Sequence, residues 1–150
     1  MTQLKIRPAV KSDMAAVHEM IAMLAVYERQ PDAVTNKIEH LTNDGFGEHP
    51  KFSCLVAEFD KQIAGFALYY PTYSTWVGPC LYLEDLLVKE EYRGKGIGGM
   101  LFEEVLEIAK QKGVKRFSWQ VLEWNEPAIK FYKKYNAVLD SEWVNCKIVL

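Results

Sequence analysis

A glycine-rich stretch, Arg93-Gly94-Lys95-Gly96-Ile97-Gly98-Gly99, lies between a run of apolar residues and a segment with helical apolar spacing. Glycine lets the backbone adopt positive φ and approach a ligand closely. The unpaired N–H groups at a helix start favour an anion, and Arg93 adds a cation with planar donors. Four glycines within residues 94–99 would weaken a helix start that had no other use. We therefore interpret the stretch as a pyrophosphate-binding turn, in preference to a glycine turn without a ligand.

Two familiar nucleotide-binding motifs do not explain this turn. The spacing Gly94-x-Gly96-x-x-Gly99 fits the dinucleotide fingerprint, which also lies between a strand and a helix. However, residues 100–150 are too few for the rest of a doubly wound sheet, and the three preceding strands are predicted to form an antiparallel meander. The last of these strands also carries adjacent acids, Glu84 and Asp85, where a buried parallel strand would be apolar. A P-loop is excluded because the chain has no Gly-Lys-Ser/Thr sequence.

The elements that position the turn are predicted from apolar periodicity and from turn residues. Helices are predicted from Ser12 or Asp13 to about 27–28, more weakly over 33–43, over 96–112, and after an Asn125 cap with Pro127 in the first turn. Strands are predicted over 4–8, 52–58, 63–70, 80–89 and 114–123, with turns at 44–50 and near 60–62, and with one or two closing strands in 138–150. This order predicts an α/β fold, a mixed sheet with helices on its faces, in a single domain that covers residues 1–150.

The overall composition is that of a soluble globular protein. The chain has 150 residues, of which 49% are hydrophobic and 25% charged, and its net charge is −2. This balance gives no general attraction to nucleic acid or to an anionic membrane surface. No run of eighteen apolar residues and no signal-peptide pattern are present, so neither a membrane partner nor export is expected, and the expected location is cytoplasmic.

The cysteines and histidines predict neither a disulfide framework nor a metal site. The three cysteines are odd in number and far apart, with no C-x-x-C spacing, which favours buried, reduced, structural thiols. The three histidines have no ligand spacing, so no metal is expected. These residues are Cys54, Cys80 and Cys146, and His18, His40 and His49.

The residues from Arg93 to Gly98 resemble the R/Q-x-x-G-x-G/A motif of the GCN5-related N-acetyltransferases, the GNAT superfamily. Together with "LYLED" (81–85), "DGFGEHP" (44–50) and "EWNEPAIKFYKKYNA" (123–137), they resemble its diamine (spermidine/spermine) and thialysine branch. The resemblance implies a central, mostly antiparallel sheet with helices on both faces. It also implies acetyl-coenzyme A as cosubstrate, direct attack by a small primary amine, and a homodimer.

The resemblance also implies where acetyl-coenzyme A would bind. The pyrophosphate would lie on the glycine turn, and the pantetheine arm would lie along the preceding strand as an added strand would. The start of the later helix would contribute further contacts. The implied cofactor-binding residues are Leu86, Leu87, Val88, Arg93, Gly94, Lys95, Gly96, Ile97, Gly98, Gly99, Asn125, Glu126, Pro127 and Ala128.

Two catalytic residues follow from the same resemblance. Tyr132 would donate a proton to the departing thiolate, although its helical spacing to Ile129 and Tyr135 is equally compatible with packing. An aliphatic ammonium, with a pKa of about 10.4, must lose a proton before it attacks. Glu84 would take this proton, directly or through a water, unless it is a solvated acid. As neighbours in a strand, Glu84 and Asp85 are expected to point to opposite faces.

The amine would lie in a groove of carboxylates and aromatic rings. Its implied residues are Tyr27, Glu28, Trp76, Glu84, Asp85, Trp119 and Glu142, with the orientation of Trp119 left open between groove and core. The loop "Ser74-Thr75-Trp76" departs from the acidic "DPW" of the spermidine/spermine enzymes. One carboxylate fewer leaves room for a shorter diamine or a lysine-like amine. Two alternatives stay open, a protein or peptide N-acetyltransferase of the same fold and a non-catalytic acyl-coenzyme A-binding module.

Overall fold

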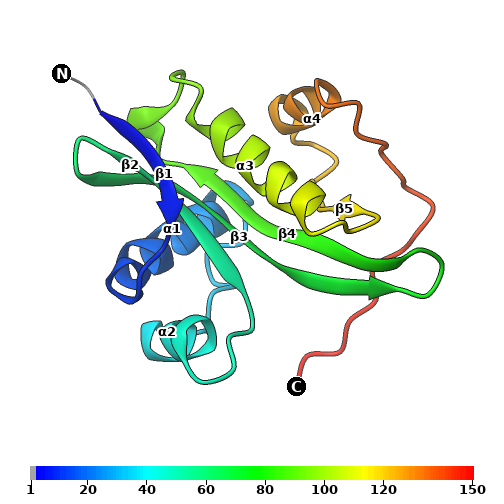
Figure 1. The fold of residues 1–150 in the computed structure, drawn as a ribbon, viewed down its shortest axis with the longest axis horizontal. Helices are drawn as coiled ribbons and strands as arrows, with labels where there is room; N and C mark the ends of the chain where they lie inside the picture. Colours follow the sequence, from blue (N-terminus) through cyan, green and yellow to red (C-terminus); the bar gives the residue numbers. More distant parts are fainter. Residues whose placement is uncertain (1–2) are drawn as a thin grey trace. The chain divides into compact units, whose positions relative to one another are not determined.

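The structure is a computed structural model that describes residues 3–150. The chain divides into two compact units, a first unit that ends at Trp119 and a second unit from Gln120 to Leu150. Figure 1 shows the elements of both units. No helix of the described residues is long and apolar enough to span a bilayer.

The first unit contains nearly all of the regular structure. Its helices are α1 (Met14–Tyr27), α2 (Ile38–Phe46) and α3 (Ile97–Gln111), with short 3₁₀ turns at Lys11–Asp13 and Glu90–Tyr92. Its strands are β1 (Leu4–Pro8), β2 (Ser53–Phe59), β3 (Gln62–Ser74), β4 (Gly78–Val88) and β5 (Phe117–Ser118). The second unit contains α4 (Glu126–Lys133).

The five strands form one sheet in the order β1-β2-β3-β4-β5. Neighbours from β1 to β4 are antiparallel, and β5 pairs parallel with β4. Asp60 and Lys61, both with positive φ (49° and 69°), connect β2 to β3 as a two-residue hairpin turn, because Phe59 pairs with Gln62. The predicted mixed, mostly antiparallel sheet is confirmed.

Helices cover both faces of this sheet. The α1 face carries Phe66 and Leu68 of β3, which pack against Met14, Val17 and Met20 of α1 in one buried cluster. The opposite face meets α3, whose Leu101 side chain lies 3.3 Å from where a Cβ on Gly65 would be. Figure 1 shows α1 and α2 on one side of the sheet and α3 on the other. The predicted covering of both faces is therefore confirmed within the first unit.

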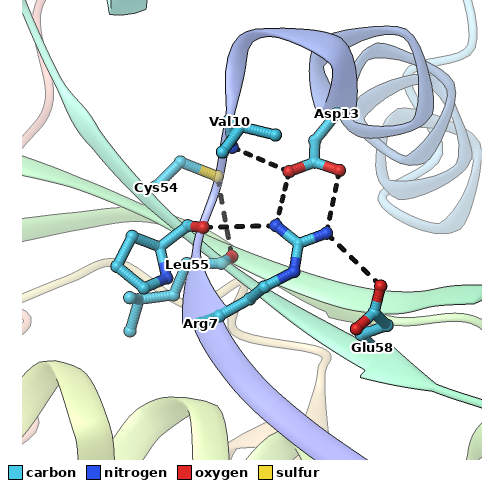
Figure 2. Close-up of polar contacts among 7 residues, drawn as sticks. Arg7, Val10, Asp13, Cys54, Leu55 and Glu58 are labelled. Atoms are coloured by element: carbon cyan, nitrogen blue, oxygen red, sulfur yellow. Dashed lines mark hydrogen bonds and ion pairs between the residues drawn. The ribbon is translucent and has the colours of Figure 1, made fainter. Parts of the chain in front are cut away.

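An ion pair fastens β1 to the start of α1 (Figure 2). Arg7 donates to Asp13 through both Nη atoms, at 2.7 Å to Oδ2 and 3.1 Å to Oδ1. The Val10 N–H also donates to Asp13 Oδ2 at 2.7 Å, and Glu58 lies 3.6 Å from Arg7 Nη2. Asp13 is 8% exposed, so this carboxylate is a buried charge that depends on its partners.

Three predicted elements differ from the structure. The weak helix expected over 33–43 is α2 at Ile38–Phe46, because residues 44–46 of the expected turn complete its last turn and the Gly47 N–H bonds to the Asn43 oxygen at 2.8 Å. The strand expected over 114–123 is reduced to the two residues of β5, which pair with Leu81 and Tyr82. The irregularity in β4 just after these residues explains the short pairing, since a bulge bends its strand away from a partner.

The closing strands expected in 138–150 are absent from the second unit, where those residues form no helix or strand. Gln120 Nε2 donates to Asn145 Oδ1 at 2.9 Å in this unit. A strand needs another strand to pair its backbone groups, and the second unit, all of whose residues are described, offers none. Apolar side chains of this segment, including Val144 and Ile148, are exposed in the single chain.

Candidate active site

The glycine turn joins β4 to α3 through residues with unusual backbone angles. Gly94 and Gly96 have φ of 78° and 79°, a region that L residues with side chains rarely adopt. A Cβ on either residue would meet no atom within 4 Å, so the backbone angle rather than lack of space requires glycine. The predicted role of these glycines in shaping a turn is consistent with this geometry.

The start of α3 offers donors to an anion. Gly96 is the N-cap, and no side chain caps the helix. The first bond within the helix runs from the Met100 N–H to the Gly96 oxygen, at 3.1 Å. The N–H groups of the preceding residues therefore face the open turn at the positive end of a helix of 15 residues. This chemistry fits a pyrophosphate.

Two cations border the turn, and each lies over an aromatic ring. Arg93 Nε donates to the Val88 oxygen at 3.0 Å, and its guanidinium lies 5.7 Å from the centre of the Tyr27 ring. Lys95 Nζ lies 5.7 Å from the centre of the Phe59 ring. Arg93, a predicted cofactor-binding residue, thus contacts Tyr27, a predicted substrate-binding residue.

Near its end, strand β4 pairs with another described strand on one edge only. Leu86, Leu87 and Val88 pair with β3 on one side. On the other side, β5 pairs only with Leu81 and Tyr82 among the described residues. An extended ligand could therefore add to β4 along its last residues as a strand would.

A β-bulge lies where the two adjacent acids stand. Asp85 pairs with Leu68 and Leu83 pairs with Tyr69, so Glu84 is an extra residue without a cross-strand partner of its own. Asp85 shares the α1 face with Leu68, and the Tyr70 hydroxyl, from the same face, donates to Glu84 Oε2 at 2.7 Å. The prediction that the two acids point to opposite faces is wrong, because the bulge interrupts the alternation.

The acids form a negatively charged group with Glu28 at the end of α1. Burial, then repulsion from Glu84 and Glu28, raises the pKa of Asp85 to about 7. Burial, then Glu84, raises the pKa of Glu28. The carboxylate of Glu84 therefore disfavours the charges of Glu28 and Asp85, and a cation placed among the three would relieve this repulsion.

Two tyrosines lie beside these acids. Tyr70 of β3 pairs with Tyr82 of β4, and their ring centres are 5.5 Å apart. Burial, then the hydrogen bond to Glu84, raises the pKa of Tyr70 above its usual range. Sequence reasoning missed Tyr70 and Tyr82. The predicted pairing of β3 with β4 could have placed these two tyrosines beside the acids. However, the register of that pairing depends on the bulge, which no local sequence pattern predicts.

The predicted aromatic substrate residues lie in different places. Trp76 is 81% exposed in the turn between β3 and β4, four residue pairs from the Tyr70–Tyr82 pair, which is roughly 13 Å along the strands. The Trp119 ring is edge-on to Phe102 of α3 at 5.1 Å and lies 5.2 Å from Phe117. Trp119 is thus directed toward α3, whereas the acids gather on the α1 face.

The remaining predicted residues belong to the second unit. Asn125 caps α4, since its Oδ1 accepts from the Ala128 N–H at 3.3 Å, and Pro127 lies in the first turn as predicted. The Tyr132 ring lies 5.3 Å from the Phe131 ring in an edge-on arrangement. Glu142 is exposed, and its N–H donates to Asp140 Oδ1 at 3.0 Å.

Comparisons with known proteins identify the family of this chain. A sequence model described as Acetyltransferase (GNAT) family matches residues 15–137. A thialysine N-epsilon-acetyltransferase of Sus scrofa is 43% identical over 145 residues, covering 91% of this chain and 85% of that protein. A human spermidine/spermine N(1)-acetyltransferase-like protein 1 is 36% identical over 150 residues, covering 95% of this chain and 22% of that protein.

A solved structure shows the same fold. An aminoglycoside acetyltransferase from an uncultured soil metagenomic sample, in complex with sisomicin, has a TM-score of 0.78 at 20% identity, covering 98% of this chain and 96% of that chain. The family match extends over most of the chain, and the relative at 43% identity is an acetyltransferase. The chain therefore belongs to the GNAT acetyltransferase family and is an acetyltransferase, with acetyl-coenzyme A as the cosubstrate of that family.

Proposed function

We propose that this enzyme transfers the acetyl group of acetyl-coenzyme A to a primary amine of a small cationic molecule, a thialysine-like amine, a diamine or a polyamine. The observation that carries the proposal is the mutual repulsion of Glu28, Glu84 and Asp85 beside the bulge of β4. An ammonium group among these carboxylates would stabilise their charges. The names of the relatives, thialysine and spermidine/spermine acetyltransferases, support the same substrate class.

Acetyl-coenzyme A is proposed to bind along β4 and the glycine turn. Its pyrophosphate would accept from the N–H groups of residues 94–99, beside Arg93 and Lys95. Its pantetheine arm would lie along Leu86–Val88, whose free edge supports this placement. The start of α4, residues 125–128, is proposed as a further contact. The absence of a side-chain cap on α3 supports the pyrophosphate position.

The reaction is proposed to be direct. Glu84 takes a proton from the ammonium, directly or through a water, and the neutral nitrogen attacks the thioester carbon. The carbon–sulfur bond then breaks, and Tyr132 donates its proton to the coenzyme A thiolate, while the nitrogen of the new amide loses its remaining extra proton to solvent, from which Tyr132 is reprotonated. Burial, then Asp13 and Asp85, raises the pKa of Cys54 to about 12, which makes this thiol a poor nucleophile and supports transfer without an acyl-enzyme.

The amine groove is proposed to contain the acids described above together with further predicted residues. Tyr27 contributes a ring beside Arg93, and Asp85 contributes a carboxylate of the α1 face. Trp76, Trp119 and Glu142 remain proposals. Of these, Trp76 would be reached only by an amine long enough to span the four residue pairs from Tyr82.

We also propose that the two units form one acetyltransferase domain that works as a cytoplasmic homodimer. The family match runs across the boundary at Trp119, which supports a single domain. The three cysteines are free, as expected in a reducing compartment, and Cys54 and Cys80 are buried as predicted, whereas Cys146 is exposed. The exposed apolar side chains of residues 138–150 support an interface. Light scattering in solution should give about twice the chain mass of 17.3 kDa, and a monomer mass would contradict the dimer.

The proposed substrate class is tested by release of free coenzyme A from acetyl-coenzyme A with a panel of amines. Thialysine, lysine, putrescine, spermidine and spermine should be compared with a lysine-containing peptide. The best small amine should exceed the peptide in kcat/KM by at least about tenfold, since it brings a second ammonium group for the three carboxylates to stabilise, which a single peptide lysine lacks. A preference for the peptide would contradict the proposal, and cofactor binding without turnover of any amine would indicate a non-catalytic module.

A further inference from the structure

Tyr70 makes a side-chain hydrogen bond to Glu84, although no motif of the sequence includes it. Its hydroxyl donates to Glu84 Oε2 at 2.7 Å, and its ring is partly buried against the core cluster of the α1 face. The distance is that of a strong bond from a hydroxyl to a carboxylate. The ring and the hydroxyl thus have different surroundings, one apolar and one charged.

Glu84 needs such a contact because of where the bulge places it. It is exposed, and as the extra residue of β4 it has no cross-strand neighbour that would restrict its rotamers. A free glutamate of this kind would sample several orientations, and holding it in one orientation during the reaction would be entropically unfavourable. The Tyr70 hydroxyl reduces this freedom before the substrate arrives.

The environment also keeps Tyr70 in the role of donor. Burial, the bond to Glu84 and the charges of Glu84 and Asp85 all raise the pKa of Tyr70, so the phenol stays protonated at the pH at which enzymes work. One oxygen of Glu84 is then occupied by this donor. Tyr70 bonds to Oε2, so the other oxygen, Oε1, is the atom that an incoming ammonium or water would meet.

We propose that Tyr70 is a positioning residue that fixes the Glu84 carboxylate for proton transfer from the amine. The inference rests on the proposed function, since it requires Glu84 to contact the substrate. Tyr70 itself exchanges no proton with the substrate. Its removal should therefore lower kcat through Glu84 and leave the binding of acetyl-coenzyme A unchanged.

A double-mutant cycle tests this dependence on Glu84. Steady-state kinetics with thialysine and saturating acetyl-coenzyme A should be measured for the wild type, Tyr70→Phe, Glu84→Gln and the double variant. Tyr70→Phe keeps the ring and removes only the hydroxyl, so kcat should fall about tenfold, the effect of losing one hydrogen bond to a charged group. In the Glu84→Gln background the same change should alter kcat by less than about twofold.

Tyr73→Phe is the matched control, because Tyr73 lies on the same strand and is 74% exposed. It should leave kcat, KM and Tm unchanged. Thermal unfolding of Tyr70→Phe should show a Tm close to that of the wild type, because its ring still packs. Glu84→Asp provides a second route, since the shorter side chain draws the carboxylate away from Tyr70. It should lower kcat, and adding Tyr70→Phe to it should have little further effect.

The possible outcomes separate this inference from the proposed function. An unchanged kcat in Tyr70→Phe, or an equal loss in the wild-type and Glu84→Gln backgrounds, would overturn the positioning role while the wild type still acetylates thialysine. A wild type that binds coenzyme A but acetylates no small amine would overturn the proposed function and this inference together. A tenfold loss that disappears in the Glu84→Gln background would support both.

Discussion

Asp85 is a residue whose environment strongly opposes its charge. It is partly buried on the α1 face, and burial, Glu84 and Glu28 raise its pKa from 3.8 to about 7. Between these two values the folded protein holds a proton that the unfolded chain releases. The resulting stability is complete below the unfolded pKa and is lost as the pH rises through about 7.

Asp85→Asn should therefore stabilise the protein, and more so at high pH. The gain in the free energy of unfolding at pH 8 should exceed the gain at pH 5 by on the order of 2 kcal/mol, because the neutral amide removes the ionisation penalty. Urea unfolding at the two pH values measures this difference. Asp32→Asn, which replaces an exposed aspartate, is the control and should show no such difference. Equal gains for Asp85→Asn at both pH values would contradict the raised pKa.

The same substitution should lower activity while it raises stability. Active sites often hold groups that destabilise the fold, and the repulsion among these acids would be relieved when the cationic amine binds. This opposite change in stability and activity distinguishes a functional acid from an ordinary surface carboxylate.

At the scale of the elements, alanine substitutions of two glycines, one near each end of α3, test whether the turn between β4 and α3 binds coenzyme A. Gly96→Ala places a side chain at φ of 79°, which should lower stability by roughly 1 kcal/mol and distort the N–H groups that would bind the pyrophosphate. Calorimetry with coenzyme A should show an affinity at least about tenfold weaker, the loss of one charge-assisted hydrogen bond.

Gly113→Ala is the matched control for this turn. Gly113 has φ of 68° and open space around its Cβ position, as Gly96 has, but it follows the other end of α3. It should lower the Tm to a similar extent and leave the affinity for coenzyme A unchanged. Equal affinities for the two variants would remove the turn from the cofactor site.

The junction of β1 and α1 depends on the Arg7–Asp13 pair. Burial opposes the charge of Asp13, but hydrogen bonds from Arg7 and Val10 outweigh burial and lower the pKa of Asp13 overall. The contribution of this carboxylate to stability is therefore present above the unfolded pKa of 3.8. It is lost as the pH falls through the lower pKa of the folded state. Asp13→Ala leaves a partly buried guanidinium without its main partner and should destabilise the protein at pH 7 by about 2 kcal/mol.

An exposed ion pair provides the comparison for Asp13. Lys51 and Asp44 lie 3.2 Å apart with side chains 70% and 37% exposed, so Asp44→Ala should lower the free energy of unfolding by less than about 1 kcal/mol. Denaturant unfolding at pH 7 measures both changes. A similar small effect for Asp13→Ala would show that β1 is held by its strand pairing alone.

For the molecule as a whole, the sequence predicted the parts that local patterns determine. The helical spacing of Met14, Val17 and Ile21, the Asn125 cap and the glycines 94–99 each identify an element without knowledge of its neighbours. The glycine turn could be placed before the structure was known, because positive φ and the helix start both follow from residue type.

Other features depend on contacts between distant segments and were not predicted. The bulge at Glu84 follows from the register of β3 against β4, and it decides which face the acids share. The short length of β5 follows from the same bulge. The sequence did not identify Tyr70 as a site residue, because its contact with the site is a hydrogen bond to Glu84, fourteen positions later in the chain. The prediction of closing strands in residues 138–150 failed because apolar residues alone do not supply a strand with which to pair.

The most direct measurement is a crystal structure of the protein with coenzyme A and thialysine. It should show pyrophosphate oxygens accepting from the N–H groups of residues 94–99 and the pantetheine arm along Leu86–Val88. The thialysine nitrogen should lie within hydrogen-bond distance of Glu84 or of a water bound to it, with the coenzyme A sulfur near the Tyr132 hydroxyl. A pyrophosphate bound away from the turn, or an amine far from the acids on the α1 face, would contradict the proposed site.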